Sequence, residues 1–202
     1  MKLESVAYAI AGVFFGLMAG WIIGSQQALL VPRAPAAQTA AAAPSGTAAA
    51  PATPAPAILD ETKVQALRTV ADRDPKNAVA RAQLGDLYYD AGKFPDAITW
   101  YEESFALNPK DVNVSTDLGV SYYYNNETDR AIEQLQHSLT LDPSHIKTLL
   151  NLGVVRAFGK QDLKGAAEVW TRLVEIAPDS PEGQAAKQAL ASIASAHPNV
   201  GQ

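Results

Sequence analysis

The chain has 202 residues, a formal net charge of −5 and no cysteine. The acidic balance argues against nucleic-acid binding, which depends on Lys and Arg contacts to phosphates. Without cysteine there is no disulfide framework, thiolate metal site, cysteine nucleophile or lipidated cysteine. Three scattered histidines (His137, His145 and His197) predict no metal cluster.

The first predicted element is an uncharged stretch of 18 residues, 6–23. As a helix it would be about 27 Å long, close to the hydrocarbon thickness of a bilayer, and a helix satisfies its own backbone hydrogen bonds in lipid. We therefore expect residues 1–25 to form a single transmembrane anchor. The alternative is a cleaved signal peptide, because small residues at 34–37 would suit a peptidase.

Glycines recur at every fourth position of this stretch: Gly12, Gly16, Gly20 and Gly24. Four residues are slightly more than one helical turn, so these glycines form a slowly spiralling stripe on one side. Another helix can approach such a stripe closely, as in GxxxG pairs. The stripe predicts helix packing in the membrane, either with a second copy or with a different membrane protein.

An Ala/Pro-rich linker is predicted over residues 26–57. Residues 31–57 contain 13 Ala and 6 Pro, and no large apolar residue lies between Val31 and Ile58. The prolines prevent a long helix, and the segment has no core to bury. We expect a disordered tether that would reach ~80 Å if fully extended.

The sidedness of the anchor depends on few charges. Lys2 and the amino terminus stand on one side and Arg33 on the other, which is nearly a tie under the positive-inside rule. Short amino-terminal anchors usually keep their N-terminus in the cytoplasm, which favours that orientation here. The expected location is thus a bacterial inner membrane with the remaining domain in the periplasm, and the sequence leaves the sidedness open.

A repeat follows the linker. Its helix-ending prolines are Pro75, Pro109, Pro143 and Pro178, at intervals of 34, 34 and 35 residues. Leucine–glycine pairs fall at the same spacing, ending at Gly85, Gly119 and Gly153, and a small residue begins the second half of each unit at Ala97, Ala131 and Ala166. The spacing predicts two helices per unit. The extra residue of the third unit is expected in the turn at 159–165.

These positions resemble the tetratricopeptide repeat, with its L-G-x-x-Y, A-x-x-x-F and P signature within 34 residues. The resemblance implies an all-α fold: an α-solenoid of three helix pairs with flanking helices over residues 58–202. The repeats are expected at about 78–111, 112–145 and 146–180, with a capping helix at 181–196. The bulky first motif position is occupied by Arg81, Ser115 and Leu149, where we expect looser or more exposed packing.

In this family the first helix of each repeat lines a concave groove that binds polypeptides. The positions implied by the resemblance for partner binding are Asp86, Tyr89, Asp90, Asp117, Val120, Tyr123, Tyr124, Leu150, Val154 and Phe158. Repeats that clamp a terminal carboxylate place Lys and Asn where this chain has Ala82 and Asp86. A basic or apolar protein segment is therefore expected, rather than a carboxylate terminus.

No nucleotide-binding loop or HExxH motif is present, and we predict no catalytic residue, metal or cofactor. The sequence predicts a membrane-anchored interaction module that recruits or scaffolds a protein partner. Two alternatives stay open. One is an assembly factor, because residues 166–190 also resemble repeat regions of cytochrome c maturation proteins. The other is a structural protein that self-assembles through the glycine stripe as a homo-oligomer.

Overall fold

The computed structural model describes residues 56–196. The predicted anchor, its glycine stripe and most of the predicted linker lie outside these residues. No helix within 56–196 is both long and apolar enough to span a bilayer. The described part of the chain contains helices and no strand, which confirms the all-α prediction.

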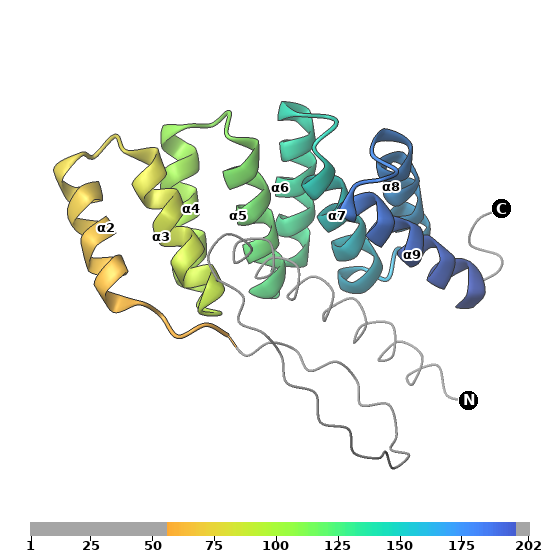
Figure 1. Cartoon of the computed structure of the whole chain (residues 1–202), viewed down its shortest axis with the longest axis horizontal. Coiled ribbons are helices and arrows are strands. Elements are labelled where there is room, and N and C mark those ends of the chain that lie inside the picture. Colours follow the sequence, from red (N-terminus) through yellow and green to blue (C-terminus); the bar gives the residue numbers. More distant parts are fainter. Residues whose placement is uncertain (1–55, 197–202) are drawn as a thin grey trace, which may run out of the picture. The chain divides into compact units, whose positions relative to one another are not determined.

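The helices follow one another as antiparallel neighbours (Figure 1). A leading helix packs against the first of three pairs, and a last helix packs on the third pair. Their bounds are α2 (Glu61–Arg73), α3 (Ala78–Asp90), α4 (Phe94–Leu107), α5 (Val112–Tyr124), α6 (Thr128–Leu141), α7 (Ile146–Val154), the π-helical turn η1 (Val155–Gly159), α8 (Leu163–Ile176) and α9 (Pro181–Ala196).

Short polar side chains begin most of these helices. Asn77 accepts a hydrogen bond from the backbone N–H of Ala80, and Asp111 accepts from Asn113 and Val114. Such caps satisfy amide donors that have no partner inside the helix. Each second helix ends two residues before a repeat proline, as α4 does at Leu107 before Pro109. The sequence punctuation therefore sets the helix boundaries.

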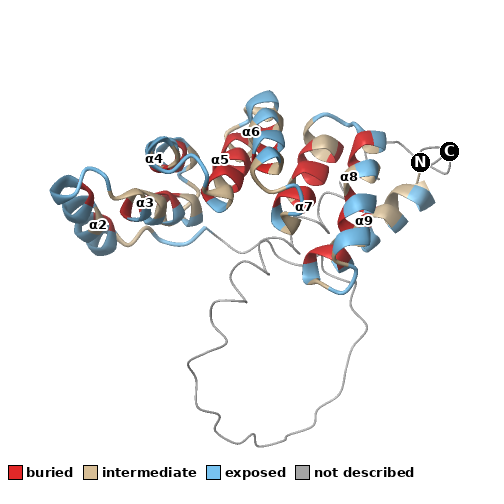
Figure 2. Ribbon diagram, turned by 90° about the horizontal axis from the view of Figure 1, so that it is seen from above, coloured by how far each residue is buried: buried red, intermediate tan, exposed pale blue. Residues whose placement is uncertain are grey.

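Within each pair, a glycine of the first helix lies against a large side chain of the second. A Cβ atom added at Gly85 would lie 2.5 Å from the Tyr101 ring, and one at Gly119 would lie 2.8 Å from Leu135 Cγ. Gly153 faces the Trp170 indole in the same way. Buried residues are concentrated where neighbouring helices face each other (Figure 2).

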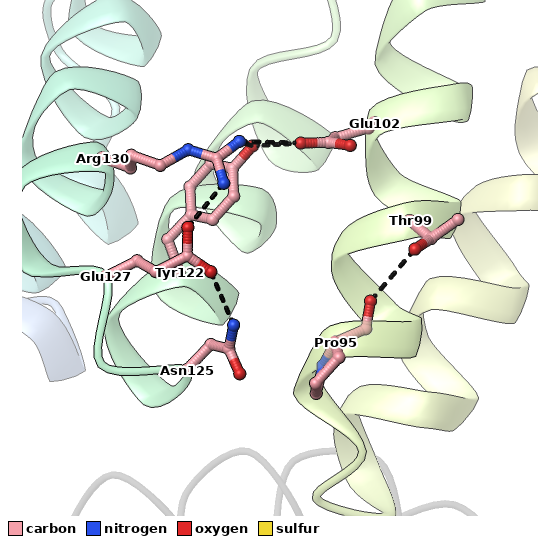
Figure 3. A network of polar contacts seen from close by, with 7 residues as sticks. All are labelled: Pro95, Thr99, Glu102, Tyr122, Asn125, Glu127 and Arg130. Atoms are coloured by element: carbon pink, nitrogen blue, oxygen red, sulfur yellow. Dashed lines mark hydrogen bonds and ion pairs between the residues drawn. The ribbon is translucent and has the colours of Figure 1, made fainter.

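Neighbouring pairs are joined by a tyrosine hydroxyl that recurs 34 residues apart. Tyr88 of α3 accepts from Arg68 of α2 at 2.8 Å, and Tyr122 of α5 donates to Glu102 of α4 at 2.5 Å. Arg130 lies over the Tyr122 ring, 4.0 Å from its centroid, and also pairs with Glu102 (Figure 3). Because Arg68 and Glu102 occupy equivalent positions, α2 stands where the second helix of a preceding repeat would be.

The expectation of looser packing at the first motif position is wrong for Ser115 and Leu149, whereas Arg81 is half-buried. Ser115 is 0% exposed and Leu149 is 1% exposed. Ser138 donates to the Ser115 hydroxyl at 2.7 Å, and the Gln134 amide donates to it at 2.8 Å. Two polar side chains of α6 thus fill the volume that a bulky apolar residue would occupy.

The extra residue of the third unit lies inside the first helix, and the prediction of a turn insertion was wrong. The three residues 160–162 connect η1 to α8, just as 91–93 connect α3 to α4. The turn residues Gly92, Asn126 and Gln161 have φ values of 69°, 64° and 57°, which identifies them as equivalent. The insertion is absorbed at 155–159 as a π-helical turn, the usual form of one residue added to a helix.

The last helix, α9, has one apolar and one polar side. The Ser180 hydroxyl accepts from the Gly183 N–H at 3.0 Å. Ala186 and Ala189 are buried, whereas Lys187 and Gln188 are exposed. One side of α9 therefore covers the third pair, and the other side faces water.

We predict that Gly153→Ala lowers the free energy of unfolding by roughly 1–3 kcal/mol, because the added methyl group collides with the Trp170 indole. Chemical denaturation followed by circular dichroism measures the change. Asn151→Ala, on the same helix at a half-buried site, is the matched control. Equal stabilities of the two variants would contradict this packing.

Gln161 adopts a left-handed conformation, which costs an L-residue with a side chain more than it costs glycine. Gln161→Gly should therefore raise the free energy of unfolding by about 0.5–1 kcal/mol. The reverse exchange at the equivalent turn, Gly92→Gln, should lower it. Thermal and urea unfolding of both variants test the pair, and a loss of stability in Gln161→Gly would show that the side chain has an unrecognised role.

Candidate functional site

The ten predicted partner-binding residues lie on α3, α5 and the α7–η1 segment. Asp86 and Asp90 are exposed, and five others are half-buried: Tyr89, Asp117, Tyr123, Tyr124 and Phe158. Val120, Leu150 and Val154 are each 8% exposed, so they offer a partner little area and mainly pack the helices. Apart from Phe158, the exposed and half-buried members form two neighbouring groups.

The first group is an aromatic cluster of Tyr89, Phe94, Tyr123 and Tyr124. The Phe94 and Tyr124 rings stack with centroids 5.0 Å apart, and Tyr89 meets both rings edge-on at 5.6 and 5.9 Å. The ring centroid of Tyr123 lies 5.6 Å from that of Tyr124. Phe94 was not predicted as a site residue, because it belongs to a second helix. Its place just before Pro95, at the start of α4, was the only available signal.

The second group is an acidic cluster of Asp86, Asp90 and Asp117. The Tyr101 hydroxyl donates to Asp86 Oδ1 at 2.7 Å. Burial raises the pKa of Asp86 and that of Asp90. Within residues 56–196, no Lys or Arg nitrogen lies within ion-pair distance of any of the three carboxylates.

Asp117 is the most perturbed member of this cluster. Burial raises its pKa to about 7, and repulsion from Asp86 adds to the shift. Lys147 of α7 opposes the shift, whereas Asp111 and Asp90 reinforce it. A carboxylate poised near neutral pH and surrounded by like charge is stabilised by any cation that approaches it.

Hydrogen bonds between α5 and α7 hold this face together. The Thr116 and Thr148 hydroxyls lie 2.6 Å apart, and His145 Nδ1 lies 2.7 Å from Thr148 Oγ1. Burial lowers the pKa of His145. The described residues contain no group of three or more His, Cys, Asp or Glu that could hold a metal ion.

The chain enters the described domain beside these clusters. The Ala57 N–H donates to the Asp90 carbonyl oxygen at 3.0 Å. Pro56 lies next to the α3–α4 turn, where a Cβ atom on Gly92 would be 3.6 Å from Pro56 Cβ. Leu59 packs against the core. An extended stretch of polypeptide, 56–60, thus already contacts the carboxyl end of α3.

Comparison with known families settles the nature of the repeats. Two models match, one described as TPR repeat over residues 85–126 and one as tetratricopeptide repeat over residues 116–181. Residues 85–181 of the chain are tetratricopeptide repeats. The matched residues include all members of both clusters of the candidate face.

Solved structures share the fold. A crystal structure of MamA is 23% identical, with a TM-score of 0.60, over 66% of this chain and 76% of that chain. MamA from Desulfovibrio magneticus RS-1 is 26% identical, with a TM-score of 0.55, over 60% of this chain and 68% of that one. The first repeat domain of Spaghetti (RPAP3), bound to the HSP90 peptide SRMEEVD, is 24% identical, with a TM-score of 0.55, over 61% of this chain and 94% of that chain. No curated protein matches the chain.

The raised pKa of Asp117 predicts a pH-dependent stability. Its folded-state pKa of about 7 exceeds its unfolded value near 3.8. Its contribution to the free energy of unfolding is therefore most favourable below pH ~4 and is lost as the pH rises through 7. Asp117→Asn should therefore raise the free energy of unfolding by roughly 1–3 kcal/mol at pH 8 and leave it unchanged at pH ~4.

Chemical denaturation at both pH values measures this difference, with Asp72→Asn on the exposed side of α2 as the control. A stability gain of the same size at the two pH values would show that Asp117 titrates normally.

Proposed function

We propose that this protein is a membrane-tethered, non-enzymatic interaction module whose repeat domain captures a protein segment on the face formed by α3, α5 and α7–η1. The aromatic cluster carries the proposal. Its tyrosines are half-buried, so each ring is held in place and still has part of its surface exposed. Tyrosines of this kind contribute much of the binding energy at protein interfaces.

The charge of the face supports a basic or apolar partner. The exposed Asp86 and Asp90 and the half-buried Asp117 lie beside the aromatic cluster, and like charges across an interface cost affinity. The peptide SRMEEVD in the Spaghetti (RPAP3) structure ends in acidic residues and a carboxylate. We expect this face to repel such a peptide, so it serves as a negative control.

Tethering supplies the mechanism in this proposal. The uncharged segment 6–23 holds the chain in the bilayer, with the repeat domain in the bacterial periplasm, and the Ala/Pro segment spaces it. A partner captured by a tethered domain is confined near the membrane, which raises its effective concentration there without any new contact. The role is recruitment or scaffolding of that partner.

Photo-crosslinking in native membranes tests the location of the binding face. A photoreactive amino acid replaces Val79, which is 66% exposed on α3; the matched control replaces Glu133, which is exposed on α6. The expected result is crosslinked partner from the α3 position and none from the α6 position. Equal crosslinking from both positions would reject the face.

Substitution of the tyrosines tests their contribution. Tyr89→Ala and Tyr123→Ala should each weaken partner binding roughly tenfold, as loss of an interface tyrosine typically costs over 1 kcal/mol. Titration of the crosslinked partner with full-length protein measures the affinity, and circular dichroism checks folding. Glu133→Ala is the control. Unchanged affinity in both folded tyrosine variants would refute the proposed role of the cluster.

A further inference from the structure

One guanidinium group of this fold is bound by three kinds of group at once: an aromatic ring, a phenol hydroxyl and carboxylates. Arg130 lies over the Tyr122 ring (Figure 3), 4.0 Å from its centroid, and its Nη2 atom donates to the Tyr122 hydroxyl at 2.7 Å. The same nitrogen donates to Glu102 at 3.0 Å, and Nη1 pairs with Glu127. The fold thus contains a complete arginine-binding arrangement on its own surface.

A second arginine repeats part of this arrangement. Arg68 lies over the Trp100 ring, 5.7 Å from its centroid, and donates to the Tyr88 hydroxyl at 2.8 Å. The lysines that form ion pairs within residues 56–196 behave differently, because Lys63 and Lys160 each contact a carboxylate and lie over no ring of these residues. In the described part of the chain, the cations on aromatic rings are therefore arginines.

The candidate face presents the same kinds of group around Tyr89. Burial raises the pKa of the Tyr89 hydroxyl well above its usual range, and the charges of Asp117 and Asp90 add to the rise, so both carboxylates lie near that hydroxyl. No Lys or Arg nitrogen of residues 56–196 forms an ion pair with either carboxylate, and no guanidinium of these residues lies over the Tyr89 ring. The groups that hold Arg130 thus recur on this face without an arginine from the described chain.

The rings decide which cation this face favours. Carboxylates attract any cation, so charge alone does not distinguish arginine from lysine. A guanidinium is planar, stacks on an aromatic face and donates through a rigid fork of N–H groups, whereas an ammonium is a compact, strongly hydrated charge. Hydrogen bonds from a guanidinium to carboxylates are also charge-assisted. A face that combines aromatic rings with carboxylates therefore favours arginine.

We propose that the protein segment captured on this face presents an arginine, whose guanidinium group lies against the aromatic cluster at Tyr89 and donates to Asp90 and Asp117. This inference rests on the proposed function, because it names the chemistry of the partner at the same surface. Arginine should bind roughly two- to five-fold more tightly than lysine, which is the contribution of a cation–π contact at a partly exposed site.

Tyrosine-ring NMR of the full-length protein in detergent tests the preference. The chain has seven tyrosines, so ¹³C labelling of their rings gives a small set of signals, which single Tyr→Phe variants assign. The probes are N-acetyl-arginine amide, N-acetyl-lysine amide and N-acetyl-leucine amide. The Tyr89 signals should shift and saturate at a lower concentration of the arginine probe than of the lysine probe. Tyr122, whose ring already contacts Arg130, is the internal control and should not respond.

Variants of the face test each contact. Asp90→Asn combined with Asp117→Asn should weaken binding of the arginine probe several-fold, and Asp72→Asn, on the exposed side of α2, should not. Tyr89→Leu, which keeps an apolar side chain and removes the ring, should weaken the arginine probe more than the lysine probe, as read from the Tyr123 signals. Circular dichroism checks that every variant is folded.

Three results would overturn the arginine proposal. The first is an equal affinity of the native protein for the arginine and lysine probes. The second is an affinity for the leucine probe as high as for the arginine probe, which would show an apolar surface only. The third is the absence of any shift at Tyr89 up to the solubility limit of the arginine probe.

The outcomes separate this inference from the proposed function. If the arginine and lysine probes bind equally while Tyr89→Ala still weakens the crosslinked partner, the arginine preference is wrong and the binding face stands. If the arginine probe binds as expected while Tyr89→Ala and Tyr123→Ala leave the partner's affinity unchanged, the face binds a guanidinium group but is not the surface that captures the partner.

Discussion

The close approach of two helices at a glycine is the constraint on which the rest of this domain depends. In each pair a glycine of the first helix lies directly against a large side chain of the second: Gly85 against Tyr101, Gly119 against Leu135 and Gly153 against Trp170. Each first helix therefore packs against its partner at a fixed distance. Interiors this well packed tolerate few changes in volume. The same contact repeats three times, and the orientation of each first helix follows from it.

This packing leaves the opposite side of the first helices available for other contacts. Once Gly85 and Tyr88 of α3 are fixed inward, Asp86, Tyr89 and Asp90 project elsewhere, because successive helical residues point in different directions. The α3–α4 turn then places Phe94 beside Tyr89. The aromatic and acidic clusters are therefore positioned by packing contacts in which most of their members take no part.

The sequence predicted the features that depend on backbone rules. Prolines and small residues at a regular interval identified the helix pairs, since a proline ends a helix and a glycine permits close contact wherever they occur. Features that depend on partner side chains were missed or misjudged. Ser115 reads as a poor core residue until Gln134 and Ser138 are seen beside it.

The site was predicted unevenly for the same reason. The repeat register placed Tyr89, Tyr123 and Asp117 on first helices, but Phe94 joins them only through a turn, and the raised pKa of Asp117 arises from burial among groups far apart in the sequence. The π-helical turn at 155–159 was invisible because the glycine and proline spacing is the same whether a residue is added to a helix or to a loop. The anchor, the glycine stripe and the sidedness remain predictions.

The equivalence of α2 to a second helix limits how far the array can extend. Lys63 stands where Ala97 and Ala131 stand in the complete pairs, and its side chain is 69% exposed. At the other end, Gln188 takes the position of Gly153 on α9 and faces water. Neither end of the described stack has, at this position, the small residue that would let another helix pack closely. A further helix added at either end of the described stack would therefore have to pack against a large polar side chain.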